Sequence, residues 1–178
     1  VDNETITAVK TKTYLAFHKP LGVLSTMSDP EDRPCLSDYF LDWQERLFHV
    51  GRLDKESEGL IIVTNDGQWA HEATHPSFEV KKTYLVATEE TLPRAAFDLL
   101  SRGVELDDGL ARPLAVNRFG GFTEIVIHEG RNHVVRRIFD EIGFPVTRLI
   151  RTAFGSIKLG ELPSGKWRAL NEVEITNL

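Results

Sequence analysis

The chain has 178 residues, 41% of them hydrophobic and 27% charged, which is typical of one globular domain with a buried core. No apolar run approaches the roughly 20 residues that cross a membrane, and no N-terminal stretch resembles a signal peptide, so we expect no membrane partner. The single cysteine, Cys35, excludes an internal disulfide and favours the reducing cytoplasm.

The formal net charge of -6 argues mildly against a nucleic-acid partner, but the charge is unevenly distributed. Residues 29–45 hold six acids and one arginine, whereas residues 142–160 hold no acid. The basic residues in and just before that second segment are Arg131, Arg136, Arg137, Arg148, Arg151 and Lys158. They indicate either a basic face for an anionic partner or ordinary solvated charge, and the charge pattern alone leaves both open.

The first predicted elements are short and separated by turn signals. Residues 1–12 are polar and predict a flexible tail, so the expected domain is 13–178. Residues 13–17 predict a strand that ends at Lys19-Pro20, and residues 36–41 predict a short helix. Residues 60–64 predict a buried strand before the turn sequence Asn65-Asp66-Gly67, and residues 79–88 predict another strand.

The second half of the chain has the clearest periodicity. Residues 93–101 and 132–142 predict helices that stop at the next glycine. Residues 122–128 predict a strand after a hairpin turn at Gly120-Gly121, and residues 145–154 predict a strand followed by shorter ones. Because the strands do not alternate regularly with helices, the sequence predicts an α+β fold with a largely antiparallel sheet.

The helix expected over residues 132–142 separates its two adjacent arginines. Stepping about 100° per residue gathers Val134, Ile138 and Ile142 on one face, with Arg136 just beyond its edge. Arg137 lies well away from that face. We therefore expect Arg136 to border the core beside a carboxylate, and Arg137 to meet solvent or a ligand.

The segment HEATH, residues 71–75, matches the H-E-x-x-H pattern of zinc metalloproteases. Pro76 follows at once and disfavours helical geometry at His75, whereas a zinc site needs both imidazoles on a continuing helix. Lys81 also stands where the longer motif has a third histidine. We expect a short surface helix without a metal, and keep a zinc hydrolase as an alternative.

The most unusual stretch is GRLDKESEGL, residues 51–60, a charged loop that leads directly into the buried strand. Such a loop can hold Asp54 beside a rigid sheet, with an arginine nearby to keep it ionised as a nucleophile. A structural turn with an Arg52–Asp54 contact is the simpler alternative, and the spacing alone does not exclude it.

The same stretch, extended to GRLDKESEGLIIVTNDG, resembles the signature of pseudouridine synthases, in which a G-R-L-D loop carries the catalytic aspartate. The segments HKPLG (18–22), KTY (82–84), EGRNHVVRR (129–137) and LIRTAFGSIKLGELPSGKWRAL (149–170) match further motifs of the family. The resemblance covers about residues 13–173. It is strongest to the RsuA-type ribosomal RNA enzymes, and among them to large-subunit members without an N-terminal S4 RNA-binding module. Val134 and Ser57 depart from the usual glutamine and threonine.

The resemblance implies a pseudouridine synthase catalytic fold, with a mixed, mostly antiparallel sheet in two lobes and flanking helices. It also implies isomerisation of a specific uridine to pseudouridine in ribosomal RNA, without a cofactor. The catalytic residues would be the nucleophile Asp54, Tyr84 stacked on the uracil, and Arg136 as the ion partner of Asp54. Supporting and substrate-binding residues would be Lys19 and Lys82, then Arg52, Arg131, Arg137, Arg148 and Arg151.

A non-catalytic module that binds RNA or the ribosome is the second alternative, and it differs in predicting that Asp54 is dispensable. Ribosomal RNA is the expected partner in either case, and we expect a monomer.

Overall fold

The computed structural model describes residues 11–178, so residues 1–10 of the expected tail lie outside the described part. Nine strands form one sheet, with β11-β1-β3-β9-β4-β8-β7 as its main order, β2 on β3 and β10 on β9. Its strands are β1 (Tyr14–Lys19), β2 (Phe48–Val50), β3 (Ser57–Thr64), β4 (Lys82–Thr88), β7 (Ala115–Phe119), β8 (Phe122–Ile127), β9 (Val146–Phe154), β10 (Ile157–Lys158) and β11 (Trp167–Ala169).

The helices and a separate hairpin lie around this sheet. The α-helices are α1 (Gly67–Thr74), α2 (Arg94–Arg102), α3 (Val134–Glu141) and α4 (Glu172–Thr176), and the 3-10 helices are η1 (Leu36–Tyr39) and η2 (Pro76–Phe78). Strands β5 (Val104–Leu106) and β6 (Gly109–Ala111) pair only with each other. Apart from the parallel pair β3–β9, the strand pairs of the described chain are antiparallel, as the sequence predicts.

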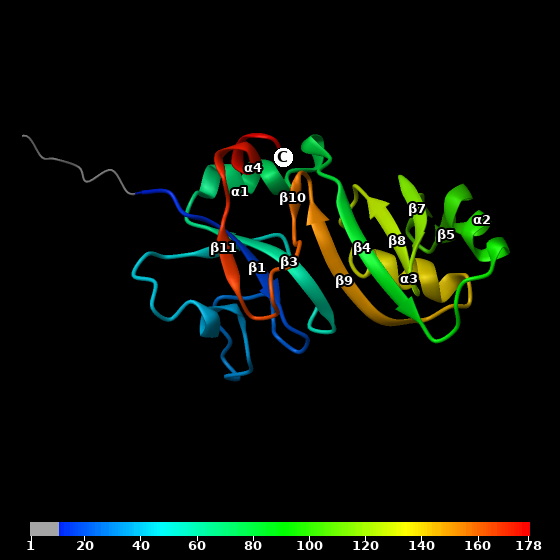
Figure 1. Cartoon of the computed structure of the whole chain (residues 1–178), viewed down its shortest axis with the longest axis horizontal. Coiled ribbons are helices and arrows are strands. Elements are labelled where there is room, and N and C mark those ends of the chain that lie inside the picture. Colours follow the sequence, from blue (N-terminus) through cyan, green and yellow to red (C-terminus); the bar gives the residue numbers. More distant parts are fainter. Residues whose placement is uncertain (1–10) are drawn as a thin grey trace, which may run out of the picture.

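The sheet is shared by two lobes (Figure 1). One lobe carries β11, β1 and β3 with α1 and α4, and the other carries β4, β8 and β7 with α2, α3 and the β5–β6 hairpin. Strand β9 runs between them, pairing with β3 on one side and with β4 on the other. The expected mixed sheet in two lobes with flanking helices is therefore confirmed.

The core lies on both faces of the sheet because side chains alternate along a strand. Leu15, Phe17 and Ile61 belong to a cluster that continues under α3, whereas Ala16 and Leu60 belong to a second cluster. The second cluster includes alanines of α1 and is closed by the chain's last segments. Strand β3, which is buried along most of its length, thus forms the rigid support that GRLDKESEGL enters.

The junction of the lobes requires a glycine at position 59. Gly59 has φ of 110° and pairs with Arg151, and a Cβ there would lie 2.3 Å from the Arg151 carbonyl oxygen. Only glycine adopts this conformation without strain and allows such an approach. Gly59 therefore lets β9 lie directly beside β3, which fixes where Arg151 stands relative to the loop before β3.

Several element ends differ from the sequence prediction because single residues adopt left-handed backbone conformations. The helix expected from residue 132 begins only at Val134, since His133 has φ of 52°. The strand expected from residue 79 begins at Lys82, since Glu79 has φ of 43°. The pairs β2–β3 and β5–β6 were not predicted, whereas Gly120-Gly121 does form the predicted hairpin turn between β7 and β8. Within residues 11–178, the helices are too short or too polar to cross a membrane.

Candidate active site

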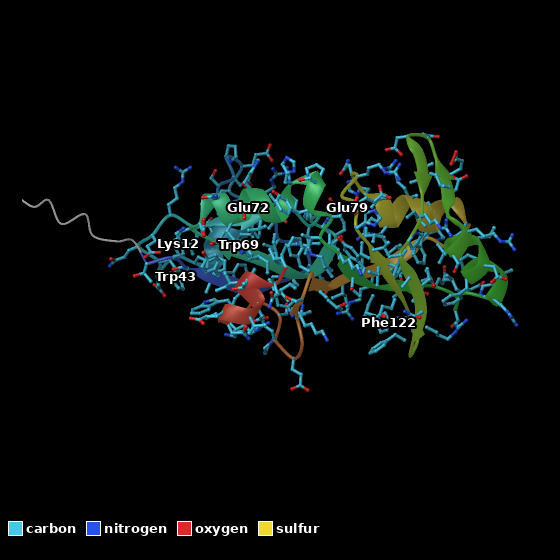
Figure 2. All side chains as sticks on the ribbon, turned by 90° about the horizontal axis from the view of Figure 1, so that it is seen from above. Lys12, Trp43, Trp69, Glu72, Glu79 and Phe122 are labelled. Carbon is cyan, nitrogen blue, oxygen red and sulfur yellow. The ribbon has the colours of Figure 1, made fainter. Side chains whose placement is uncertain are left out.

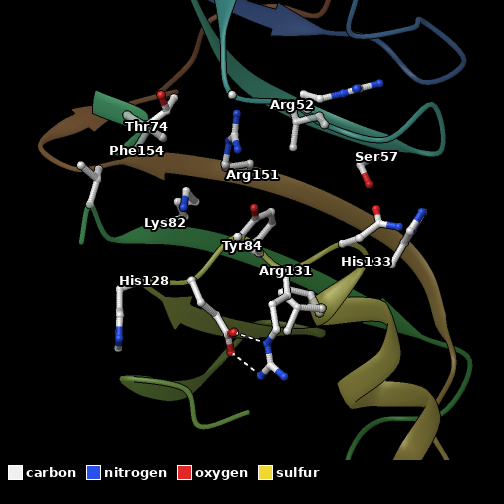
Figure 3. A pocket seen from close by; sticks show the side chains of 18 of the residues that line it. Arg52, Ser57, Thr74, Lys82, Tyr84, His128, Arg131, His133, Arg151 and Phe154 are labelled. Atoms are coloured by element: carbon white, nitrogen blue, oxygen red, sulfur yellow. Dashed lines mark hydrogen bonds and ion pairs between the residues drawn. The ribbon is translucent and has the colours of Figure 1, made fainter. Parts of the chain in front are cut away.

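A cleft of about 880 Å³ opens between the two lobes (Figure 3). One wall comes from residues 51–57 and from the end of α1 with η2, and the other comes from residues 128–136. Side chains of β4 and β9 form its floor, namely Lys82, Tyr84, Leu149, Arg151 and Phe154. The GRLD, KTY and EGRNHVVRR motifs, which are far apart in the sequence, therefore meet in one site.

The GRLD loop is held by hydrogen bonds to a neighbouring serine. The backbone N–H of Leu53 donates to Ser25 Oγ at 3.0 Å, and that hydroxyl donates to the Leu53 carbonyl at 2.5 Å. Leu53 is buried in the core, so the next residue, Asp54, is directed into the cleft. The Asp54 carbonyl accepts from Ser57 N–H at 3.0 Å, which closes the turn into β3.

The Asp54 carboxylate contacts a histidine rather than the expected arginine. His133 Nδ1 lies 3.1 Å from Asp54 Oδ2. The left-handed conformation of His133, just before α3, turns its side chain toward the GRLD loop. No sequence signal identified this residue, because a left-handed histidine at a helix start is not predictable from periodicity.

The expected ion pair between Arg136 and Asp54 was wrong for this structure. Arg136 Nη2 donates to the Glu56 carbonyl at 2.9 Å and approaches Ser57 Oγ at 3.3 Å, while its buried Nε has no partner. From α3, the Arg136 side chain thus reaches the backbone beyond Asp54 instead of the Asp54 carboxylate. It therefore fastens α3 to the turn that carries the carboxylate.

Arg151, expected to contact phosphate, is a buried residue of the cleft floor. Its side chain is only 2% exposed, since β9 is paired on both sides. Nε donates to the Leu60 carbonyl at 2.8 Å and the guanidinium lies over the Phe154 ring, while Nη2 is buried without a partner. Buried polar groups normally find partners, so the cleft offers this N–H to an acceptor of an incoming ligand.

The cleft floor combines an aromatic ring with buried positive charge. Tyr84 lies at the centre of the view in Figure 3, with Arg151 and Lys82 beside it, and only 9% of its surface is exposed. Burial lowers the pKa of Lys82, and the nearby Arg151 charge lowers it further, while Glu129 opposes both. A planar ring under cationic groups is suited to a flat, electron-rich ligand such as a nucleobase.

Lys19 lies beneath the site rather than in it. Its fully buried Nζ donates to the carbonyls of Pro20 at 3.0 Å and Val23 at 2.6 Å. Burial lowers the pKa of Lys19 to about 8, partly offset by nearby carboxylates that include Glu58 and Asp54. Lys19 therefore organises the turn after β1 and adds positive potential below the GRLD loop.

Three of the expected phosphate-contact arginines are paired with carboxylates. Arg131 donates to Glu129, to Asp108 at 2.8 Å, and to the carbonyls of Gly109 and Leu110. Arg137 lies 3.0 Å from the same Asp108, and Arg148 makes two hydrogen bonds to Glu58. Glu129 raises the pKa of Arg131, Arg137 lowers that of Asp108, and Glu58 raises that of Arg148.

Arg52 is the exception among the five predicted substrate-binding arginines. It lines the cleft, and within residues 11–178 no carboxylate or hydrogen-bond acceptor lies close enough to pair with its side chain. Its guanidinium is thus directly available to a phosphate or a base.

The HEATH segment ends as Pro76 predicts. Helix α1 stops at Thr74, and His75 is its extended C-cap with ψ of 133°, so the two imidazoles do not share a continuing helix. Within the described residues, no three His, Cys, Asp or Glu side chains are grouped as a metal site would require. This geometry does not fit a zinc hydrolase.

A family model described as RNA pseudouridylate synthase matches residues 13–141 of this chain. The chain belongs to this family. The match spans the GRLD loop, the β4 part of the cleft floor and all of α3. Together with the relatives below, it assigns the protein to the pseudouridine synthases of the RsuA type, enzymes that isomerise uridine in RNA.

Relatives in several bacteria agree with this assignment. An uncharacterized RNA pseudouridine synthase of Mycobacterium leprae (strain TN) is 44% identical over all of this chain and 73% of its own length. The ribosomal large subunit pseudouridine synthase B of Bacillus subtilis (strain 168) is 34% identical over 93% of this chain and 70% of its own length. The more specific likeness to the large-subunit enzyme RluE is not confirmed.

Solved structures show the same fold. The crystal structure of a pseudouridylate synthase superposes with a TM-score of 0.86 at 30% identity, covering 96% of this chain and 75% of that one. A chain of the archaeal box H/ACA sRNP Nop10–Cbf5 complex superposes with a TM-score of 0.57 at 17% identity, covering 84% of this chain and 50% of that one. At that identity the second likeness supports the fold alone.

Proposed function

We propose that this pseudouridine synthase modifies a uridine of large-subunit ribosomal RNA in the cytoplasm, with Asp54 as its nucleophile. The cleft carries this proposal, because it presents the Asp54 carboxylate together with Tyr84 and two arginines, Arg136 and Arg151, each of which has one buried N–H without a partner. The ribosomal substrate is supported by the relatives named as ribosomal large subunit pseudouridine synthase B.

The reaction breaks the N1–C1′ glycosidic bond and forms a C5–C1′ bond, while the proton on C5 is lost and N1 gains one. Atoms and electrons balance within the nucleotide, so this chemistry calls for no cofactor. Asp54 attacks C1′ as the N1–C1′ bond breaks, and the Asp54–C1′ bond breaks in turn when C5 of the rotated base bonds to C1′. Tyr84 stacks on the uracil, and its hydroxyl takes the C5 proton.

The remaining side chains position these groups. His133 holds the Asp54 carboxylate until the RNA arrives, and Arg136 anchors the turn behind it. The free N–H of Arg151 donates a hydrogen bond to an acceptor in the cleft, either a uracil carbonyl or the Asp54 carboxylate. Arg52 enters the space left in the RNA when the target nucleotide is extruded.

Phosphates of the RNA backbone have to compete with carboxylates for three of the arginines. Arg131, Arg137 and Arg148 bind phosphate only by giving up Asp108 or Glu58, so they add less affinity than exposed unpaired arginines would. Arg52 is then the arginine whose removal weakens RNA binding most among the five. Lys19 and Lys82 support the site electrostatically, and the active unit is a monomer.

The test is Asp54→Asn, assayed by tritium release from ribosomal RNA labelled at uridine C5 and by mapping pseudouridine. The variant should fold and bind RNA but lose turnover by at least about a thousandfold. Asp98→Asn on exposed α2 is the matched control and should keep full activity. Turnover by Asp54→Asn within about tenfold of the parent would refute the nucleophile and favour the non-catalytic RNA-binding module.

A further inference from the structure

Three aromatic rings lie at the rim of the cleft, in the HEATH segment and in η2 directly after it, which the proposed chemistry leaves unused. The ring centroids of His71 and His75 are 5.4 Å apart, and those of His75 and Phe78 are 6.0 Å apart. All three side chains are exposed, and Phe78 is 58% exposed. We call His71, His75 and Phe78 the rim aromatic row.

The row is continuous with the catalytic cleft. His75 lines the same cavity as Asp54 and Tyr84, together with its neighbours Thr74 and Pro76. Figure 2 labels Glu72, which follows His71 in α1, and Glu79, which follows Phe78. A nucleic acid that places one nucleotide in the cleft therefore passes the rim aromatic row with an adjacent nucleotide.

The row is held in place before any ligand binds. His75 Nδ1 accepts the backbone N–H of Ser77 at 3.2 Å and lies 2.6 Å from Ser77 Oγ, which fixes the ring plane. Pro76 fixes the backbone after His75, and the left-handed Glu79 ends η2 directly after Phe78. Such fixed rings cost little conformational entropy when a flat ligand stacks on them.

We propose that the rim aromatic row binds an unpaired nucleobase of the RNA beside the target uridine by stacking. The inference rests on the proposed function, since it takes the RNA of that reaction as the ligand. Extruding the target uridine removes a stacking partner from its neighbour, and an aromatic ring replaces that partner for any of the four bases. The row therefore contributes to affinity and leaves the choice of sequence to other contacts.

The chemistry of the row favours a base over the other possible occupants. A metal would need further ligands beside the two imidazoles, and within the described residues no three His, Cys, Asp or Glu side chains are grouped to hold one. A phosphate would need cationic side chains here, whereas the flanking residues Glu72 and Glu79 are acidic. Flat faces at aromatic contact distance, open to solvent at the mouth of an RNA-modifying cleft, remain suited to stacking.

The test compares Phe78→Ala, Phe78→Leu and Phe78→Trp on a ribosomal RNA fragment that contains the mapped target uridine. Removing the ring should raise KM about tenfold, with a much smaller change in kcat. Leucine should behave like alanine because it is apolar but cannot stack, whereas tryptophan should restore the parent KM. The exposed position of Phe78 makes all three variants compatible with folding.

A second series replaces each nucleotide flanking the target, one at a time, by an abasic nucleotide. At one position the abasic RNA should raise the KM of the parent protein about as much as Phe78→Ala does. The same abasic RNA should not raise the KM of the Phe78→Ala protein any further. Additive losses at every position, or a parent-like Phe78→Leu, would overturn the proposal. The proposal would also be overturned if Phe78→Ala impaired modification of ribosomal particles but not of the free RNA fragment, because the row would then bind a protein partner.

The two proposals fail in different ways. If the parent protein forms no pseudouridine in the RNA, the proposed function is wrong, and with it the ligand assigned to the row. If the parent modifies the RNA while Phe78→Ala is indistinguishable from it in KM, only the rim aromatic row is refuted.

Discussion

Replacing Gly59 by alanine tests the junction that brings the two halves of the site together. The new Cβ would lie 2.3 Å from the carbonyl oxygen and 2.7 Å from the nitrogen of Arg151, at a φ of 110° that L residues rarely adopt. Both obstructing atoms belong to the backbone of β9, so no side-chain rotation relieves the overlap. The strands have to separate by about 1 Å to restore an ordinary carbon–oxygen contact.

The expected cost follows from the short length of that pairing. Strands β3 and β9 pair over only three positions, Ser57–Leu149, Glu58–Ile150 and Gly59–Arg151. Losing two of the backbone hydrogen bonds costs about 1 kcal/mol each, and holding alanine at this φ adds about 1–2 kcal/mol. We expect Gly59→Ala to lower the unfolding free energy by about 3–4 kcal/mol.

Urea unfolding followed by tryptophan fluorescence measures this change, and Gly121→Ala is the matched control. A Cβ at Gly121 has no heavy atom within 4 Å, so this variant should stay within about 0.5 kcal/mol of the parent. Activity of Gly59→Ala should also fall, because displacing β9 moves Arg151 relative to Asp54. A Gly59→Ala protein within about 1 kcal/mol of the parent would refute the close-approach argument.

Three further predictions concern single side chains of the site. His133→Gly removes the contact to Asp54, but glycine suits the φ of 52° at this position. We therefore expect kcat to fall about tenfold while the unfolding free energy changes by less than about 1 kcal/mol. A kcat equal to that of the parent would contradict the positioning role. Tyr84→Phe should keep RNA affinity and lose tritium release from uridine C5, and normal release would exclude the proton-transfer role. Burial lowers the pKa of Lys19 in the folded protein to about 8, compared with 10.5 in the unfolded chain. Below pH 8 the buried ammonium therefore lowers the unfolding free energy, and this cost disappears as the pH rises through 10.5. Measured by urea unfolding, the parent should therefore gain up to about 3 kcal/mol relative to Lys19→Met between pH 8 and 10.5, and a constant difference would contradict the burial effect.

Features that depend on neighbouring residues could be predicted without the structure. Leu60-Ile61-Ile62-Val63 predicted the buried strand, Gly120-Gly121 the hairpin turn, and Pro76 the end of the helix at His75. The GRLD motif located Asp54, and the resemblance placed Tyr84 in the same site. These signals are local, since backbone sterics and burial patterns act within a few residues along the chain.

Tertiary structure alone decided which charged groups meet. Asp54 and His133 are 79 positions apart, and their contact depends on a left-handed residue whose conformation periodicity does not reveal. The helical periodicity placed Arg136 correctly at the edge of the core. Its partner, the Glu56 carbonyl, depends on how α3 lies beside the turn before β3.

The same limit explains the arginines of the second half of the chain. The family resemblance gave Arg151 the same expected role as Arg148, although β9 buries the first and leaves the second exposed beside Glu58. Burial of a strand residue depends on which strands flank it, and β3 and β4 come from other parts of the chain. The net charge of a segment can be summed from its sequence. Whether each charged side chain is free to bind a ligand depends on the partners that the folded chain brings within a few ångströms of it.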